Sequence, residues 1–518
     1  MEIDIYWTSL LLLLAPVVLF TGRWLLPQTT WARGRKGETA GHDGTSEKPP
    51  NDEEARRFRR KFLQVYLLVM GSEWLQGPYM YALLRDEKKR GEATVATLFV
   101  TAYVAAAAAA LATGFLADRF GRRRACLAFC ALHSLASLSV LADRLAVLLA
   151  GRVLAGVALT LLWTVFESWM VTEFRARGFD EDAARSRSGL SLATMFGVMT
   201  TSNCLAAILG GVVAHCLVLA FGSRMSPFVV GPILEAVAVG LMLKDWNENY
   251  GCEATPSLPV ATQIGDPKVW ILSLVTCCFE GTNFLVLFFW PGMFRQAHAR
   301  SRPSAPAEDP SGGTSTEDAV PFGVIFGSFM AAMILGAMLF NAVVPSSCSA
   351  SSRNTSFLQP HVLLGAAMLG AGLSLLGAVL ATSEAATLLA FLLFEACNGF
   401  YVPGVAHQRG ILIDGTNRAG LYGLMKLPLF GFVVVALCTT VEDPHHRRAV
   451  LIACCVTLVG ASVLSGLGLG QGGGRGLLPS TEMGLGVVRV SDDTAEEQAL
   501  ERRSLGRVST ESEKGAYL

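Results

Sequence analysis

The sequence predicts an all-α membrane protein with many transmembrane spans. Hydrophobic residues make up 52% of the 518 residues and charged residues only 16%, whereas soluble domains carry about 25% charged residues. The mean hydropathy is +0.44, and apolar stretches of about the 20 residues that a helix needs to cross a bilayer recur along the chain. The formal net charge is zero, so no bulk charge points to a nucleic-acid partner.

The first apolar segment, about residues 5–26, is expected to be an N-terminal anchor helix. Glu2 and Asp4 stand where a secretory signal carries positive charge, and no A-x-A cleavage site follows. A cleaved signal peptide is the alternative. The basic cluster Arg56–Lys61 ends the polar linker after this segment and places the linker in the cytoplasm.

Twelve further spans are expected, and a polar stretch divides them six and six. They lie at about 62–84, 94–117, 125–142, 145–172, 188–220, 226–243, 268–294, 320–343, 358–381, 385–406, 418–440 and 447–470. The predicted parts are an anchor helix (1–27), a cytoplasmic linker (28–61), two six-helix bundles (62–243 and 268–470) around a central cytoplasmic loop (244–267), and a disordered cytoplasmic tail (471–518).

Basic residues set the predicted topology. Loops at 119–124, 173–187 and 407–418 carry Arg or Lys and are expected in the cytoplasm. The short loop Arg85–Arg90 disagrees, because its four basic residues fall on the outer side; Asp86 and Glu87 offset part of that charge.

One short turn between two spans, Gly114–Arg124, combines two glycines, an aspartate and four arginines. Glycine permits a positive φ and close helix approach, and a carboxylate beside guanidinium groups can lock neighbouring helix ends. A cluster that only fixes topology would need the basic residues alone. We therefore expect a gating loop, formed by Gly114, Asp118, Arg119, Gly121, Arg122 and Arg123.

Four glutamates inside predicted spans are candidates for carrying protons: Glu73, Glu280, Glu395 and Glu167. Ionisable groups in a bilayer are expensive and are functional candidates by default. Without positive partners they would favour each other's protonation. The alternative is that each is hydrogen-bonded across helices in a structural role. Glu235 is a weaker candidate.

Cations and amides inside the spans are candidates for binding an anionic substrate. Arg152 and Lys426 lie one or two turns inside their spans and could attract an anion, although Arg152 could instead snorkel to the interface. The polar candidates, equally plausible as contacts between helices, are Gln76, Asn203, Asn283 and Asn398. His133 and His215 are isolated in the sequence and are expected to be structural.

The sequence offers no sign of an enzyme. It has no P-loop, nucleophile elbow or metal-ligand spacing, and ten of its twelve cysteines lie in apolar segments, where they act as small hydrophobic residues. No cofactor or metal is therefore expected. What is left is a secondary transporter.

Several motifs carry a resemblance to a known family. Gly114–Arg124 resembles the signature loop between helices 2 and 3 of the major facilitator superfamily, and Arg152-Val153-Leu154-Ala155-Gly156 resembles its helix-4 signature. Glu73–Tyr79, Phe166–Trp169 and Asn398–Pro403 are similar to motifs of the eukaryotic molybdate-anion transporter family.

The resemblance implies a major facilitator fold with uptake of molybdate across the plasma membrane. Two departures stand out: Met170 replaces a common tyrosine, and Lys426 replaces a common arginine, which keeps the charge but loses the bidentate fork. Coupling to protons is one option. The alternatives are a proton-coupled carrier of sugars or other organic solutes, and a membrane sensor or scaffold that transports nothing.

Overall fold

The computed structural model describes residues 4–25, 52–110, 112–179, 192–251, 266–301, 320–343, 359–412, 428–429, 431–439 and 444–469. Nearly all of them are helical. The helices are α1 (Ile5–Leu25), α3 (Asp52–Gln76), η1 (Gly77–Tyr79), α4 (Met80–Ala82), η2 (Leu83–Glu87), α5 (Glu92–Ala110), α6 (Thr113–Phe120), α7 (Arg122–Ser139), α8 (Leu145–Ala176), α9 (Leu192–Phe221), α10 (Ser226–Asp245), α12 (Pro267–Ser301), α13 (Phe322–Val343), α14 (Pro360–Leu380), α15 (Glu384–Leu412) and α17 (Pro444–Gly468).

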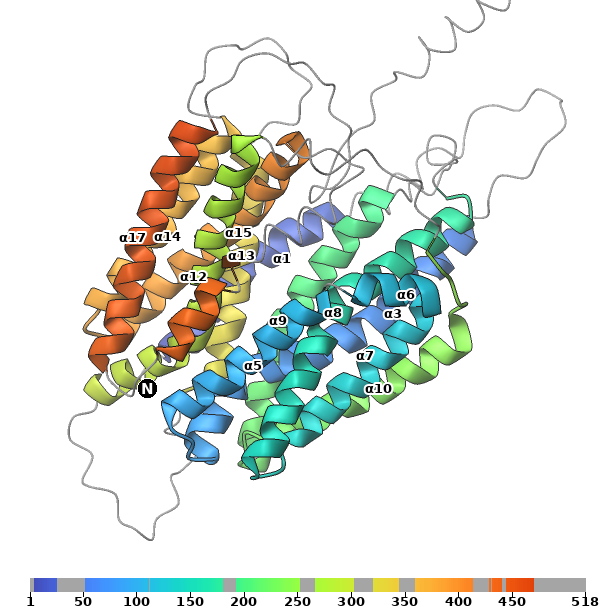
Figure 1. Ribbon diagram of the computed structural model, residues 1–518, viewed down its shortest axis with the longest axis horizontal. Coiled ribbons are helices and arrows are strands. Elements are labelled where there is room, and N and C mark those ends of the chain that lie inside the picture. The colour runs from blue at the N-terminus through green and yellow to red at the C-terminus, as the bar shows by residue number, and fades with distance from the viewer. Residues whose placement is uncertain are drawn as a thin grey trace, which may run out of the picture. The chain divides into compact units, whose positions relative to one another are not determined.

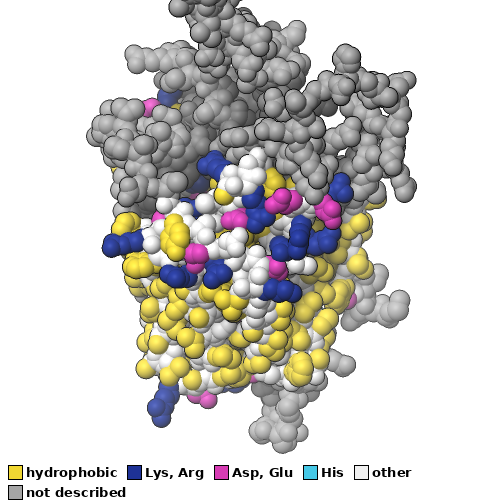
Figure 2. Space-filling view, turned by 90° about the vertical axis from the view of Figure 1, so that its right-hand side faces the viewer, with side chains coloured by type: hydrophobic (Ala, Val, Ile, Leu, Met, Phe, Trp, Pro, Cys, Tyr) yellow, Lys and Arg dark blue, Asp and Glu magenta, His cyan; other side chains and the backbone are white. Residues whose placement is uncertain are grey.

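Long apolar helices confirm the predicted fold class. Within the described residues, nine helices are long and apolar enough to cross a membrane: α5, α8, α9, α10, α12, α13, α14, α15 and α17. Large apolar side chains such as Leu138, Trp163 and Val237 are exposed. Figure 2 shows a band of hydrophobic side chains bounded by a belt rich in Lys, Arg, Asp and Glu, as expected for a surface that faces lipid.

The helices form two groups of neighbours. In the N-terminal group, α3 packs against α9 and α10, α7 against α8 and α10, and α5 against α8. In the C-terminal group, α14 packs against α15 and α17, and α12 and α13 both pack against α15 (Figure 1). The division into two six-helix bundles at the predicted boundaries stays a prediction.

Three helices are clearly longer than the sequence indicated, and one of them, α12, runs to Ser301 instead of ending near residue 294. α3 begins at Asp52, so the basic cluster Arg56–Lys61 forms its first turns instead of ending a linker. α15 continues to Leu412, into the segment 407–418 that was expected to be a loop. The extension of α15 matters for function because it places Arg409 on a helix.

The two groups meet most closely where α9 crosses α13. A Cβ atom added to Gly211 would lie 2.5 Å from the backbone oxygen of Gly323, and one added to Gly323 would lie 2.2 Å from the backbone oxygen of Gly211. Small residues allow this approach of two helix backbones. We call this crossing the glycine seam.

Helix α1 packs along α13 beside the glycine seam. The hydroxyl of Tyr6 donates a hydrogen bond to Glu384 at 2.7 Å, and the ring of Trp7 lies 6.1 Å from that of His215 on α9. Leu10 and Val17 are fully buried. The N-terminal helix therefore contacts both groups.

Replacing Gly323 by alanine is expected to destabilise the protein by about 1–3 kcal/mol, because overpacking against backbone atoms cannot be relieved by a side-chain rotation. Thermal denaturation of the purified protein measures the effect. Gly240→Ala is the control, since nothing lies within 4 Å of the added Cβ. Equal melting temperatures for the two variants would contradict the glycine seam.

Candidate functional site

A cluster of buried polar groups joins α3, α7 and α10. Glu73 forms an ion pair with Nε2 of His133 at 2.9 Å, and Nδ1 of the same ring contacts Glu235. Ser72 donates to Glu235 at 2.8 Å. His133 is thus held between two carboxylates on different helices.

Two sequence expectations are corrected by this cluster. His133 is not isolated, and Glu73 does not lack a basic partner. Sequence reasoning missed the histidine because its partners lie 60 and 102 residues away in the chain, and only the packing of α10 against both α3 and α7 brings them together. The signal available was that His133 is a polar residue inside an apolar span.

The candidate amides of the N-terminal group already have protein partners. Gln76 donates to the hydroxyl of Ser137 at 2.7 Å and is buried. The Asn203 side chain accepts a hydrogen bond from the indole of Trp74 at 2.8 Å. Both therefore join helices in this structure.

Arg152 differs from Glu73, which is held in an ion pair with His133. Its guanidinium lies 5.6 Å from the centre of the Phe99 ring and approaches the Met80 sulfur at 3.9 Å. It attracts Glu73 and Tyr103 electrostatically, yet makes no ion pair with an acidic residue in the part of the chain that the structure describes. An intramembrane cation without a tight partner is suited to a negative ligand.

Aromatic contacts place Arg152 at the boundary between the two groups. The rings of Phe99 and Phe288 lie 5.3 Å apart, and those of Tyr103 and Phe284 lie 4.9 Å apart. Phe99 and Tyr103 are on α5, and their partners are on α12. Arg152 therefore lies beside the contact between α5 and α12.

In the C-terminal group, Glu280 of α12 accepts a hydrogen bond from Arg409 of α15 at 3.0 Å. The expectation that Glu280 lacks a positive partner is wrong, because α15 extends further than predicted. Asn283, less than one turn along α12, has a buried carbonyl oxygen without a hydrogen-bond partner among the described residues.

The remaining candidates make no contact with these clusters among the described residues. Glu395 is buried and accepts a hydrogen bond from Asn398 of its own helix at 3.0 Å. Glu167 is half-buried and makes no hydrogen bond or ion pair with a described residue. Lys426 lies outside the described residues.

The predicted gating loop is a docking site for the segment that follows α10. Gly121 has a φ of 109°, and Arg122 donates its backbone N–H to Asn249 at 2.9 Å. Arg123 donates to the backbone oxygen of Trp246 at 2.8 Å and to Glu248 through its own backbone N–H at 2.8 Å. The loop therefore holds α10 to α7.

Charge pairs extend this contact across the predicted cytoplasmic end. Asp118 and Arg122 form an ion pair at 2.8 Å. Gly114 is exposed with no atom within 4 Å of an added Cβ, and Arg119 is exposed over the ring of Phe120. Of the six predicted gating residues, these two make no contact that would lock the loop.

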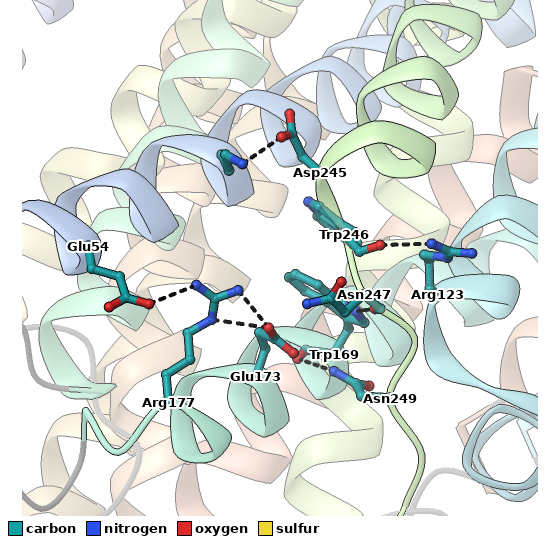
Figure 3. Close-up of polar contacts among 10 residues, drawn as sticks. Glu54, Arg123, Trp169, Glu173, Arg177, Asp245, Trp246, Asn247 and Asn249 are labelled. Carbon is teal, nitrogen blue, oxygen red and sulfur yellow. Dashed lines mark hydrogen bonds and ion pairs between the residues drawn. The ribbon is translucent and has the colours of Figure 1, made fainter.

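Two tryptophans are stacked at the centre of the same end. The rings of Trp169 and Trp246 lie 3.7 Å apart, and Trp169 donates to the backbone oxygen of Asn247 at 2.9 Å. Around them, Lys61 pairs with Asp245 at 2.5 Å. Figure 3 shows the two tryptophans and, nearby, Arg177 between Glu173 and Glu54. The stacked tryptophans and the Lys61–Asp245 pair were missed from sequence, because each joins segments far apart in the chain.

Two ion pairs connect the N-terminal and C-terminal groups at the opposite end. Arg447 of α17 pairs with Glu92 at the start of α5 at 2.8 Å, and Arg295 of α12 pairs with Asp86. The basic loop that disagreed with the predicted topology is also neutralised, because Lys88 pairs with Asp143 at 2.7 Å and lowers the pKa of that carboxyl. We call Glu92–Arg447 and Asp86–Arg295 the outer ion pairs.

The described residues hold no group of three or more His, Cys, Asp or Glu side chains placed to bind a metal ion. The site consists of intramembrane charges and aromatic rings between packed helices. Such a site can bind and release a charged solute.

Comparison with known proteins decides the family. Residues 39–382 match a major facilitator family described as sugar transporters with 12 transmembrane segments. This protein belongs to the major facilitator superfamily. The molybdate-anion transporter of Xenopus tropicalis is 30% identical over 78% of this chain and 84% of its own length, and that of Danio rerio is 28% identical over 72% and 77%. The resemblance to the molybdate-anion transporter family is thereby confirmed.

Solved structures agree in fold. A peptide transporter of the POT family superposes with a TM-score of 0.62 at 11% identity, covering 83% of this chain and 99% of its own. A D-xylose–proton symporter superposes with a TM-score of 0.55 at 12% identity, covering 80% and 97%. These structures show the fold alone, whereas the family match and the molybdate-anion transporter relatives show that this major facilitator is a multi-pass membrane transporter.

Gly121 and Gly114 are expected to respond differently to alanine. Gly121 has a positive φ, and its added Cβ would lie 2.5 Å from the Glu248 side chain. Gly121→Ala should therefore reduce the amount of folded protein and its transport rate several-fold. Gly114→Ala should change the free energy of unfolding by no more than about 0.5 kcal/mol. The amount of folded protein and the transport rate should therefore stay close to those of wild type. Size-exclusion profiles and uptake measure the difference, and a damaging Gly114→Ala would count against this reading of the loop.

Proposed function

We propose that this major facilitator takes up molybdate across the plasma membrane by alternating access. The observation that carries the proposal is Arg152, an intramembrane cation without an acidic partner at ion-pair distance among the described residues. Relatives named molybdate-anion transporters support the choice of anion.

The charge pattern suits an oxyanion. A guanidinium supplies several N–H donors in a fixed fork, which matches the oxygens of a tetrahedral dianion. A cation left unpaired at this depth is costly, so a negative ligand that pairs with Arg152 recovers part of that cost. Lys426, on the basis of sequence alone, is proposed as a further ligand.

Proton coupling is proposed to run through the Glu73–His133–Glu235 cluster. A proton bound there changes the charge that faces an incoming dianion, so it would relieve repulsion from the carboxylates. The other titratable or charged groups that act on this cluster are Arg152 and Cys130. Glu280, Glu395 and Glu167 remain candidates from the sequence.

A sugar carrier is the second candidate, because the matched family is described as sugar transporters. Three aromatic side chains that could stack on a sugar ring are, however, engaged by the protein. Trp169 is stacked on Trp246, Tyr401 is stacked on Phe279 at 3.8 Å, and the Trp74 indole is hydrogen-bonded to Asn203. This favours the anion.

Arg152→Gln is expected to lower kcat/KM for labelled molybdate by about 10- to 100-fold, the effect of losing a charged hydrogen bond to the substrate. Uptake in a molybdate-deficient cell, with tungstate, sulfate and glucose as competitors, measures it. Arg144→Gln, on the exposed end of the same helix, is the control and should transport normally. Competition by glucose but not tungstate would support the sugar carrier instead.

Uptake is expected to rise as the external pH falls, and His133→Gln should remove that dependence. Glutamine can still donate a hydrogen bond from its amide to a carboxylate, but it has no group that gains and loses a proton. The readout is the ratio of initial rates at acidic and neutral pH. His215→Gln changes another buried histidine and should keep the acid stimulation. A wild-type rate that does not change with pH would indicate uniport.

A further inference from the structure

We propose that Tyr103 is a second ligand of the transported oxyanion, whose hydroxyl donates a hydrogen bond to one oxygen while Arg152 binds another. This inference rests on the proposed anion transport and names a further residue of the same site. Tyr103 is not among the residues that the sequence pointed to, because a tyrosine in an apolar span carries no charge that marks it out.

The hydroxyl of Tyr103 lacks a protein partner. Tyr103 is buried, with 9% of its surface exposed, and a buried tyrosine usually places its hydroxyl against a hydrogen-bond partner. Tyr79 and Tyr81 follow this rule, since they contact His215 and Glu92. The Tyr103 hydroxyl makes no hydrogen bond with any residue that the structure describes. A buried hydroxyl without a partner is costly, so a bound oxyanion would supply the acceptor that the protein does not.

Close packing of α5 and α8 holds Arg152 beside Tyr103. A Cβ added to Gly156, one turn after Arg152, would lie 2.2 Å from the backbone oxygen of Ala102, the residue before Tyr103. The two helix backbones therefore touch next to both side chains, and Arg152 and Tyr103 are near enough to interact electrostatically. The glycine thus sets the separation of two donors that come from different helices.

Neighbouring rings fix the direction of the Tyr103 side chain. Its ring lies 6.4 Å from that of Phe99, one turn earlier on α5, and 4.9 Å from that of Phe284 on α12, both edge to face. The Arg152 guanidinium lies over the other neighbour of this ring, Phe99. A donor whose orientation is already fixed loses little entropy on binding. Because Phe284 belongs to the C-terminal group, the two donors lie at the boundary between the groups, where a transporter built from two halves binds its substrate.

A neutral donor beside a cation suits a dianion that must also be released. A tetrahedral oxyanion has four oxygens, more than one guanidinium fork can contact. A second cation at this depth would be costly whenever the site is empty, whereas a phenol adds a donor without adding a charge. Its hydrogen bond becomes strong only when the charged acceptor arrives. Tyr103 therefore adds affinity for the anion and leaves the charge of the empty site unchanged.

The test compares molybdate binding by purified full-length variants, measured by calorimetry and by the rise in melting temperature on adding molybdate. Tyr103→Phe keeps the ring and removes only the hydroxyl. It should raise the Kd about 10-fold or more, the loss of one hydrogen bond to a charged group. The melting temperature of the empty variant should equal or exceed that of wild type, because the removed hydroxyl has no protein partner.

Tyr66→Phe is the matched control. Tyr66 of α3 is also buried, and its hydroxyl likewise makes no hydrogen bond within the described part of the chain, but the groups that act on it are Cys204 and Glu167 and not Arg152. This variant should bind molybdate as wild type does. Equal weakening by both substitutions would reflect a general effect of losing a buried hydroxyl, and it would overturn the proposal.

The remaining outcomes separate this inference from the proposed function. If wild type binds molybdate and Tyr103→Phe binds it equally well, the role of Tyr103 is wrong and the anion transport stands. A lower melting temperature of empty Tyr103→Phe, or its failure to fold, also overturns the inference, because a hydroxyl that stabilises the empty protein has a partner there. Wild-type protein that binds glucose but no molybdate overturns the proposed function, and this inference with it.

Discussion

Charge that a bilayer removes from water has to be paired, and this requirement arranges the interior of the transporter. A charged side chain at the centre of a membrane costs at least about 2.5–3.5 kcal/mol. Glu73 meets His133 on another helix, and Glu280 meets Arg409; each pair fixes which faces of two helices can pack together. Arg152 is a buried cation for which the described helices provide no acidic partner at ion-pair distance, and the proposed function follows from that observation.

The fold could be predicted from sequence, since apolar length depends on local composition alone. The mid-span glutamates could be found in the same way. Their partners could not be found, because Arg409 meets Glu280 only through the extension of α15, and His133 meets Glu73 and Glu235 only where α10 packs against both α3 and α7. A sequence shows where a charge is buried, but the tertiary structure decides what neutralises it.

The gating loop illustrates the same limit in a motif that the sequence does show. The pattern identifies Gly121 and Asp118, and the structure supplies the reason for the glycine: the carboxylate of Glu248 fills the space where a Cβ would be. Gly114 belongs to the same motif without any contact that requires it here. A residue can therefore belong to a sequence motif without making a contact that requires it. The sequence pattern shows which residues belong to the motif, and the structure shows which of them make such contacts.

Helix α1 has a consequence for how the transporter changes state. It packs along α13 and also contacts α9 through Trp7 and His215, so it crosses the line along which the two groups would separate. Because α1 packs on α13 and also touches α9, it resists separation of the two helix groups at its own end and leaves the opposite end unconstrained. Under the alternating access that we propose, the two ends of the molecule would therefore open unequally, because of a helix that contributes no group to the proposed substrate site.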